Sequence, residues 1–188
     1  ALDDQGLAGH RLLLGYLVSC VGAREFDPAM CQEAIACFVD NASPRGGLPG
    51  TLCDTHRAGE GQAPIMTWAA WSIYERSGDR DWLAHVYPGL AGYCDFWFKY
   101  PRSLRGLAQF YNAGQIGDND PRFDPVYGRP QGNEPVAGLE SPDLNAFFVV
   151  EMRGLAKMAA ALGLNVEAAR WQAKASQLAQ LIVDTMYF

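Results

Sequence analysis

Apolar residues recur at helical spacing in roughly six stretches of this sequence, and the stretches alternate between two kinds. In the first kind, apolar side chains surround the helix, which predicts burial on nearly all sides. In the second kind they form one stripe, which is typical of a helix that covers a core from outside. We expect all-round helices over Gln5–Cys20, Ala63–Ser77 and 141–162, and striped helices over 27–38, 79–97 and Asn165–Tyr187.

The links between these helices are alternately short and long. Short links are expected at 21–26, 78–79 and 163–164, and long ones at 41–62 and 101–140. Antiparallel helices joined in this way place every long link at the N-terminal end of the all-round helices, which we expect to be the functional face. The order predicts an all-α fold, an α/α toroid of the (α/α)6-barrel type, present here as a half barrel or open arc. A superhelical stack of helix hairpins is the alternative.

Composition limits the partners and cofactors. The chain has 188 residues, 49% of them apolar, which suffices for the core of one domain. A net charge of −6 without a basic run argues against nucleic acid and against an anionic membrane surface. Because no apolar run approaches the length of a membrane span, we expect no membrane segment and favour the cytoplasm. The five cysteines include neither a C-x-x-C pair nor a histidine at ligand spacing, so we expect no metal.

The longest link, 101–140, is rich in Gly, Pro, Asn and Asp, and we expect a loop rather than a helix or strand. Loops of this length in compact domains are usually functional or disordered. At its middle lie Asp118, Asp120 and Asp124, with Arg122 among them. Neighbouring carboxylates raise one another's pKa, and an arginine holds one ionised, which is the combination that glycosidic bond cleavage requires. Alternatively, these residues form local Asx turns.

Three motifs resemble a known family. They are D-N-D-P-R-F-D at 118–124, Q-A-P-I-M-T-W-A at 62–69 and S-P-D-L-N-A-F at 141–147. In order and spacing they resemble segments of glycoside hydrolase family 63 and its relatives, the mannosylglycerate and glucosylglycerate hydrolases and the family 37 trehalases. The similarity runs from about Phe26 to the C-terminus.

The resemblance implies an (α/α)6 barrel of inverting glycosidases that needs no metal or cofactor. It makes Asp118 the general acid and places Gln62 at the mouth, where it binds sugar hydroxyls. The expected substrate is a small saccharide or glycoside, a short α-linked glucoside or mannoside. Further substrate-binding candidates are Tyr111 and Tyr127, which suit stacking on a sugar ring but equally suit anchoring the loop, and Arg122, which alternatively braces it. We expect Asn119, Asp120, Asp124 and Asp143 to brace the loops.

The sequence also departs from the family pattern. Residues 114–116 replace the family's E-S-G, Asp120 replaces a serine, and no tryptophan-aspartate motif is recognisable near the first helix. The family's general base, a glutamate, lies beyond the last residue, and Glu60, Glu134 and Glu140 match no base motif. We therefore expect residues 1–188 to be one toroid domain, a fragment of a longer catalytic domain whose remaining half is a candidate partner. The alternative is a non-catalytic helical-hairpin module that binds carbohydrate or protein.

Overall fold

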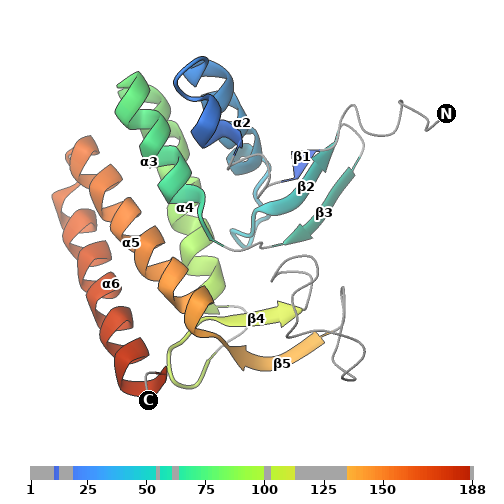
Figure 1. Ribbon diagram of the computed structural model, residues 1–188, viewed down its shortest axis with the longest axis vertical. Coiled ribbons are helices and arrows are strands. Elements are labelled where there is room, and N and C mark those ends of the chain that lie inside the picture. Colours follow the sequence, from blue (N-terminus) through green and yellow to red (C-terminus); the bar gives the residue numbers. More distant parts are fainter. Residues whose placement is uncertain are drawn as a thin grey trace.

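The computed structural model describes residues 11–12, 19–53, 56–60, 64–99, 103–112 and 135–186. Its helices lie on one side of the molecule and two small antiparallel sheets lie on the other (Figure 1). The long helices are α2 (Pro28–Asp40), α3 (Met66–Ser77), α4 (Arg80–Lys99), α5 (Pro142–Leu162) and α6 (Asn165–Met186). Strands β1 (Arg11–Leu12), β2 (Pro49–Cys53) and β3 (His56–Glu60) form one sheet, and β4 (Gln109–Asn112) and β5 (Pro135–Glu140) form the other. None of the helices described is long and apolar enough to cross a bilayer.

Helix boundaries follow the capping residues that the sequence contains. Asp27 is the N-cap of α2 and accepts a hydrogen bond from the Met30 amide at 2.9 Å, with Pro28 in the first turn. Gly78 ends α3 and Gly163 ends α5, each in the left-handed region, with φ of 67° and 80°. The short links at 78–79 and 163–164 are therefore confirmed.

The helices form two layers. In the inner layer α3 and α5 run parallel, because Thr67 contacts Glu151 and, further along both helices, Lys157 lies over the Trp71 ring. The outer helices are α2, α4 and α6; α2 packs beside α4, and α6 packs along α5. This inner and outer layering is that of an α/α toroid, so the predicted fold class is confirmed.

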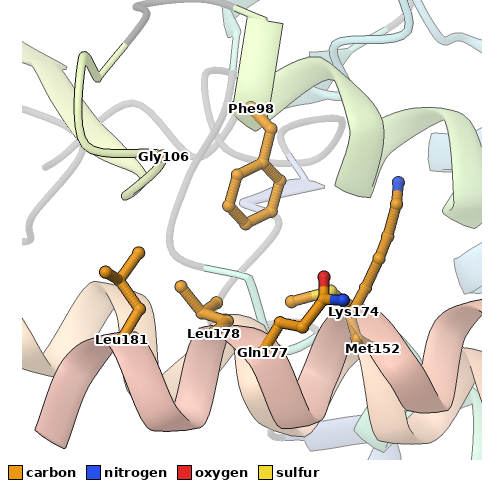
Figure 2. A pocket seen from close by; sticks show the side chains of 7 residues that line it. All are labelled: Phe98, Gly106, Met152, Lys174, Gln177, Leu178 and Leu181. Atoms are coloured by element: carbon orange, nitrogen blue, oxygen red, sulfur yellow. The ribbon is translucent and has the colours of Figure 1, made fainter. Parts of the chain in front are cut away.

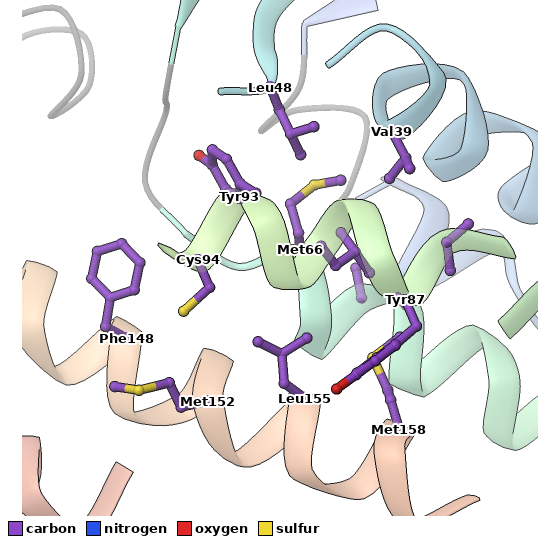
Figure 3. Packing of buried hydrophobic residues seen from close by; sticks show 14 of the residues in the cluster. Val39, Leu48, Met66, Tyr87, Tyr93, Cys94, Phe148, Met152, Leu155 and Met158 are labelled. Atoms are coloured by element: carbon purple, nitrogen blue, oxygen red, sulfur yellow. The ribbon is translucent and has the colours of Figure 1, made fainter. Parts of the chain in front are cut away.

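The core lies between the layers, where α4 meets α5 (Figure 3). Trp97 of α4 is fully buried and its ring packs against Phe148 of α5, with centroids 5.6 Å apart. The same ring meets Phe110 of β4 edge-on at 6.4 Å. Because aromatic pairs of this geometry add to the free energy of burial, Trp97 also fixes β4 to the helices.

Three expectations about local structure are wrong in part. Residues 11–12 form β1, so no continuous helix spans Gln5–Cys20, and residues 19–23, assigned partly to a link, are helical. The link 41–62 contains β2 and β3, which pair with each other, and β1 joins them. The link 101–140 contains β4 and β5. These strands form because their backbones pair with each other, although the segments have little strand propensity. Propensity is a property of single residues, so it does not predict such pairing.

Among the described residues, the all-round helices α3 and α5 still expose some large apolar side chains. Trp68 of α3 is 43% exposed, and Phe147 and Val150 of α5 are 41% and 46% exposed. Trp68 follows Thr67 directly, and Phe147 and Val150 lie within one turn of Glu151, so all three flank the contact between α3 and α5. We call these three side chains the inner apolar face.

Candidate active site

Both hairpins lead into the N-terminal ends of the inner helices. Strand β3 ends at Glu60 shortly before α3 begins at Met66, and β5 ends at Glu140 two residues before α5 begins. The sheets therefore lie at the end of the molecule that the link pattern predicts to be the functional face (Figure 1).

Most of the predicted site residues lie outside the described residues: Gln62, Asp118, Asn119, Asp120, Arg122, Asp124 and Tyr127. Tyr111 belongs to β4, where the structure describes the backbone and not the side chain. Asp143 is described in full. What the structure adds is the framework that holds the ends of the segment carrying Asp118.

Strands β4 and β5 bracket that segment. Gln109 pairs with Glu140, and Asn112 pairs with Pro135, with an irregularity in register between Phe110 and Asn112. Asn112 and Pro135, the residues that flank 113–134, are thus paired across the hairpin, and the Gln109–Glu140 end of the same hairpin adjoins the start of α5. The bracketed segment contains the predicted acid motif.

Asn145 closes the base of this hairpin. Its side chain is fully buried and its Oδ1 accepts a hydrogen bond from the Ala108 amide at 2.8 Å. Its Nδ2 donates to the carbonyl oxygens of Ala108 at 3.1 Å and of Ser141 at 2.9 Å. One amide side chain therefore satisfies both backbone groups of the residue that precedes β4, and connects them to α5. This gives the asparagine of the S-P-D-L-N-A-F motif a structural role.

Glu140, at the end of β5, is held by two neighbours across the hairpin base. Ser103 and Arg105 each donate a hydrogen bond to one of its carboxylate oxygens. Burial raises the pKa of Glu140, but the hydrogen bonds from Ser103 and Arg105, the charge of Arg105 and a hydrogen bond from Gln109 outweigh it and lower the pKa overall. A carboxylate with both oxygens engaged is a poor candidate for a catalytic base.

Asp143 lies in the first turn of α5 and interacts locally. Its Oδ1 accepts hydrogen bonds from the Ser141 hydroxyl and from the Leu144 amide, the latter at 2.8 Å. A carboxylate in this position also interacts favourably with the helix dipole. These contacts support α5 itself, and the loop-bracing role of Asp143 stays a prediction.

Sequence reasoning missed Glu151, whose side chain reaches from α5 to the start of α3. This residue of α5 is buried, with 2% exposure, and its Oε2 accepts a hydrogen bond from the Thr67 amide at 2.9 Å. The Thr67 hydroxyl donates to the carbonyl oxygen of Glu151 at 3.0 Å. Burial is the main cause that raises the pKa of Glu151 to about 7, against opposing hydrogen bonds from Thr67 and Met66. A single acid in the apolar run from Phe147 to Met152 was the available signal.

A cavity of about 300 Å³ opens elsewhere, on the outer side of the fold (Figure 2). Phe98 of α4, Met152 of α5 and the turn at Gly106 form part of its wall, and Leu178 and Leu181 of α6 form the rest, with Lys174 and Gln177 completing the lining. None of the described residues that line this cavity carries a carboxyl group, so these residues do not provide the chemistry of a glycosidase site. Within the described ranges, no group of three or more His, Cys, Asp or Glu side chains is arranged to hold a metal ion.

Comparison with known proteins identifies the family. The sequence model described as "Mannosylglycerate hydrolase MGH1-like glycoside hydrolase domain" matches residues 16–187. The chain belongs to this glycoside hydrolase family. The family resemblance seen in the three motifs is therefore confirmed. No curated protein matches the chain significantly.

Two solved structures from Thermus thermophilus share the fold. A GH63 mannosylglycerate hydrolase in complex with glucose has a TM-score of 0.75 at 16% identity, covering 96% of this chain and 58% of that one. An uncharacterized conserved protein has a TM-score of 0.72 at 18% identity, covering 93% of this chain and 57% of that one. The chain thus spans somewhat more than half the length of these relatives.

Proposed function

We propose that this chain carries the acid-bearing half of an inverting glycosidase, with Asp118 as the general acid. Membership of a glycoside hydrolase family supports the reaction class. The observation that carries the proposal is the β4–β5 pairing, which holds Asn112 and Pro135, the residues on either side of 113–134, opposite each other in the hairpin that leads into α5. In this position Asp118 belongs to a segment with fixed entry and exit, as a proton donor requires.

The reaction would need two carboxyl groups. Asp118 would protonate the leaving glycosidic oxygen, while a second carboxylate would activate water on the opposite face of the sugar. An inverting enzyme separates the two groups by about 6.5–9.5 Å. Glu140, the loop glutamate whose side chain is described, is engaged by Ser103 and Arg105, which supports a base from sequence outside this chain.

The proposed substrate is a short α-linked glucoside or mannoside. Gln62 precedes α3 by four residues in sequence, Tyr111 lies in β4, and the acid segment follows β4 in sequence, so we expect all three at the same end of the molecule. An amide would hydrogen-bond sugar hydroxyls, and the rings of Tyr111 and Tyr127 would stack on the sugar face, with Arg122 as a further contact. The bound glucose of the Thermus mannosylglycerate hydrolase supports a sugar of this size.

The test is Asp118→Asn in a polypeptide that contains this chain and the rest of its barrel. We expect turnover of α-glucosides and α-mannosides to fall by about 10³-fold or more, while sugar affinity changes little, since the amide keeps the shape but loses the proton. Asp81→Asn, at an exposed position on α4, is the matched control. Unchanged turnover in Asp118→Asn would refute the assignment, and binding without turnover in the unaltered protein would favour a carbohydrate-binding module.

The remaining half of the barrel is the proposed partner of the inner apolar face. Trp68, Phe147 and Val150 are between 41% and 46% exposed on helices whose sequence pattern predicts enclosure. We expect acrylamide to quench Trp68 fluorescence in the isolated chain and to quench it less in the longer polypeptide, measured against Trp68→Phe as a blank. Equal quenching in both would contradict this arrangement.

A further inference from the structure

The first turn of α3 has an unusual cap. The residue before it, Ile65, offers no side-chain acceptor to the free amides that begin every helix. The acceptor comes instead from another helix, because the Glu151 carboxyl of α5 receives a hydrogen bond from the Thr67 amide at 2.9 Å. A single buried carboxyl thus connects α5 to the start of α3.

The two backbones are in close contact at this point. The Thr67 hydroxyl donates to the Glu151 carbonyl oxygen, and a Cβ atom on Gly154 would lie 2.4 Å from that hydroxyl oxygen. Only glycine at position 154 therefore leaves room for the approach without displacement of Thr67. The contact therefore allows little adjustment, and the Glu151 side chain within it is buried.

The carboxyl itself is incompletely satisfied. Its second oxygen, Oε1, is buried and has no hydrogen-bond partner. The nearby titratable group on α4 is the Cys94 thiol; burial, and next the charge of Glu151, raise its pKa well above the ordinary value. The positive charges of Lys174 and Arg170, both in α6, lower the pKa of the same thiol. On α3, the groups that face Glu151 are the uncharged Thr67 and the Met66 amide.

We propose that Glu151 is a proton-controlled anchor between α5 and the first turn of α3, which stays closed while the carboxyl is neutral and opens more often once it ionises. An isolated buried charge is costly, and opening the contact would let water reach both carboxylate oxygens. Nothing in the proposed reaction requires this residue, and the anchor stands whether or not Asp118 is the acid.

The direction of the pH effect follows from linkage. The pKa of Glu151 is raised from 4.5 to about 7 in the closed contact, while in the open contact it returns towards 4.5. The closed state therefore binds the proton more tightly, and its advantage is complete below pH 4.5 and is lost as the pH rises to about 7. Between about pH 5 and pH 8 the open fraction should rise up to about seventy-fold.

Hydrogen exchange tests this directly. We expect the protection factors of the Met66 and Thr67 amides, which already correct for intrinsic exchange, to fall several tens-fold from pH 5 to pH 8. In Glu151→Gln, which keeps the shape but cannot ionise, they should stay constant within about twofold. Glu75→Gln, on the exposed side of α3, is the control and should behave like the unaltered protein. Parallel pH profiles in Glu151→Gln and the unaltered protein would overturn the proposal.

A second measurement does not need the variant to fold. Carbon-13 NMR of the labelled glutamate carboxyls in the unaltered protein should show one resonance that titrates near pH 7. Titration of every glutamate below pH 5.5 would refute the anchor.

A third measurement extends the inference to the proposed site, and this step rests on the proposed function. Gln62 lies four residues before Met66 in sequence, so opening of the first turn should weaken sugar binding. Glucose affinity should then fall with rising pH in the unaltered protein and not in Glu151→Gln. If protection changes as expected while glucose does not bind at all, the anchor stands and the proposed function fails.

Discussion

The starts of the two inner helices are fastened by different chemistry. At α5, the Asn145 amide holds the backbone of Ala108 and Ser141 through three hydrogen bonds, all between uncharged groups. At α3, the Glu151 carboxyl accepts a hydrogen bond from the Thr67 amide, and its other oxygen has no partner among the described residues. The first arrangement does not respond to protons, whereas the second does. We therefore expect a pH-insensitive attachment at the base of the β4–β5 hairpin and a pH-sensitive one at the start of α3.

Asn145→Ala should have the largest effect on this comparison. It leaves the buried amide and carbonyl of Ala108 without their partners, and each unsatisfied group costs about 1–3 kcal/mol. We expect a loss of about 4 kcal/mol in the free energy of unfolding, measured by urea denaturation. Asn41→Ala removes the partly buried hydrogen bond from the Asn41 amide to the Cys37 carbonyl, and should cost about 1 kcal/mol. An equal cost at both positions would show that Asn145 is not a special attachment.

The pH dependence of global stability is the next largest effect. Because the pKa of Glu151 is raised from 4.5 to about 7, its own contribution to stability is largest below pH 4.5 and falls by about 3 kcal/mol as the pH rises to 7. Denaturation at a series of pH values should show this fall, and Glu151→Gln should remove most of it. If stability falls equally with rising pH in Glu151→Gln, other groups cause the fall. The two attachments would then not differ in their response to pH.

Gly154→Ala tests the close approach of α3 and α5. The added Cβ would lie 2.4 Å from the Thr67 Oγ1 and 2.8 Å from its Cβ, so one helix must shift. We expect a loss of about 2 kcal/mol after allowing for the better helix propensity of alanine. Gly92→Ala on α4 is the control, because no atom lies within 4 Å of its added Cβ, and it should be neutral or stabilising by up to about 1 kcal/mol. A neutral Gly154→Ala would show that the contact is loose.

Glu140→Gln should have the smallest effect. Because the pKa of Glu140 is lowered, its carboxylate stabilises the fold above the ordinary pKa of 4.5. This contribution to stability is lost as the pH falls below 4.5. Since Arg105 is more than half exposed, we expect about 1 kcal/mol or less at pH 7. Comparison of the acid denaturation of Glu140→Gln with that of Glu167→Gln, an exposed pair with Arg170, would measure it. If Glu140→Gln lowers stability more than Asn145→Ala does, the ion pair of Glu140 with Arg105 is the main attachment of the hairpin.

The helices and their ends were predictable because their signals are local. Asp27 followed by Pro28, and the glycines that end α3 and α5, act within one turn of the chain. The alternation of all-round and striped patterns correctly predicted the inner and outer layers. It did not predict that the inner apolar face is exposed. A hydrophobic pattern indicates which side chains favour burial, but it does not indicate whether residues of the same chain cover them.

The strands and the attachments were not predictable from local signals. Strand β3, His56–Glu60, has neither alternation nor β-branched residues, and it exists because it pairs with β2. Asn145 and Glu151 stand in a family motif and in an apolar run, but their partners, Ala108 and Thr67, are 37 and 84 residues away. The catalytic assignments of Asp118 and Gln62 stay predictions, since both residues lie outside the described part of the chain.

The pairing of β4 with β5 has a consequence for how such a chain evolves. Because Asn112 and Pro135 are registered against each other, the sequence between them can lengthen, shorten or exchange residues while its two points of departure keep their spacing. Selection can therefore change that stretch of sequence alone, while the paired strands and the helices that hold them need not be rebuilt.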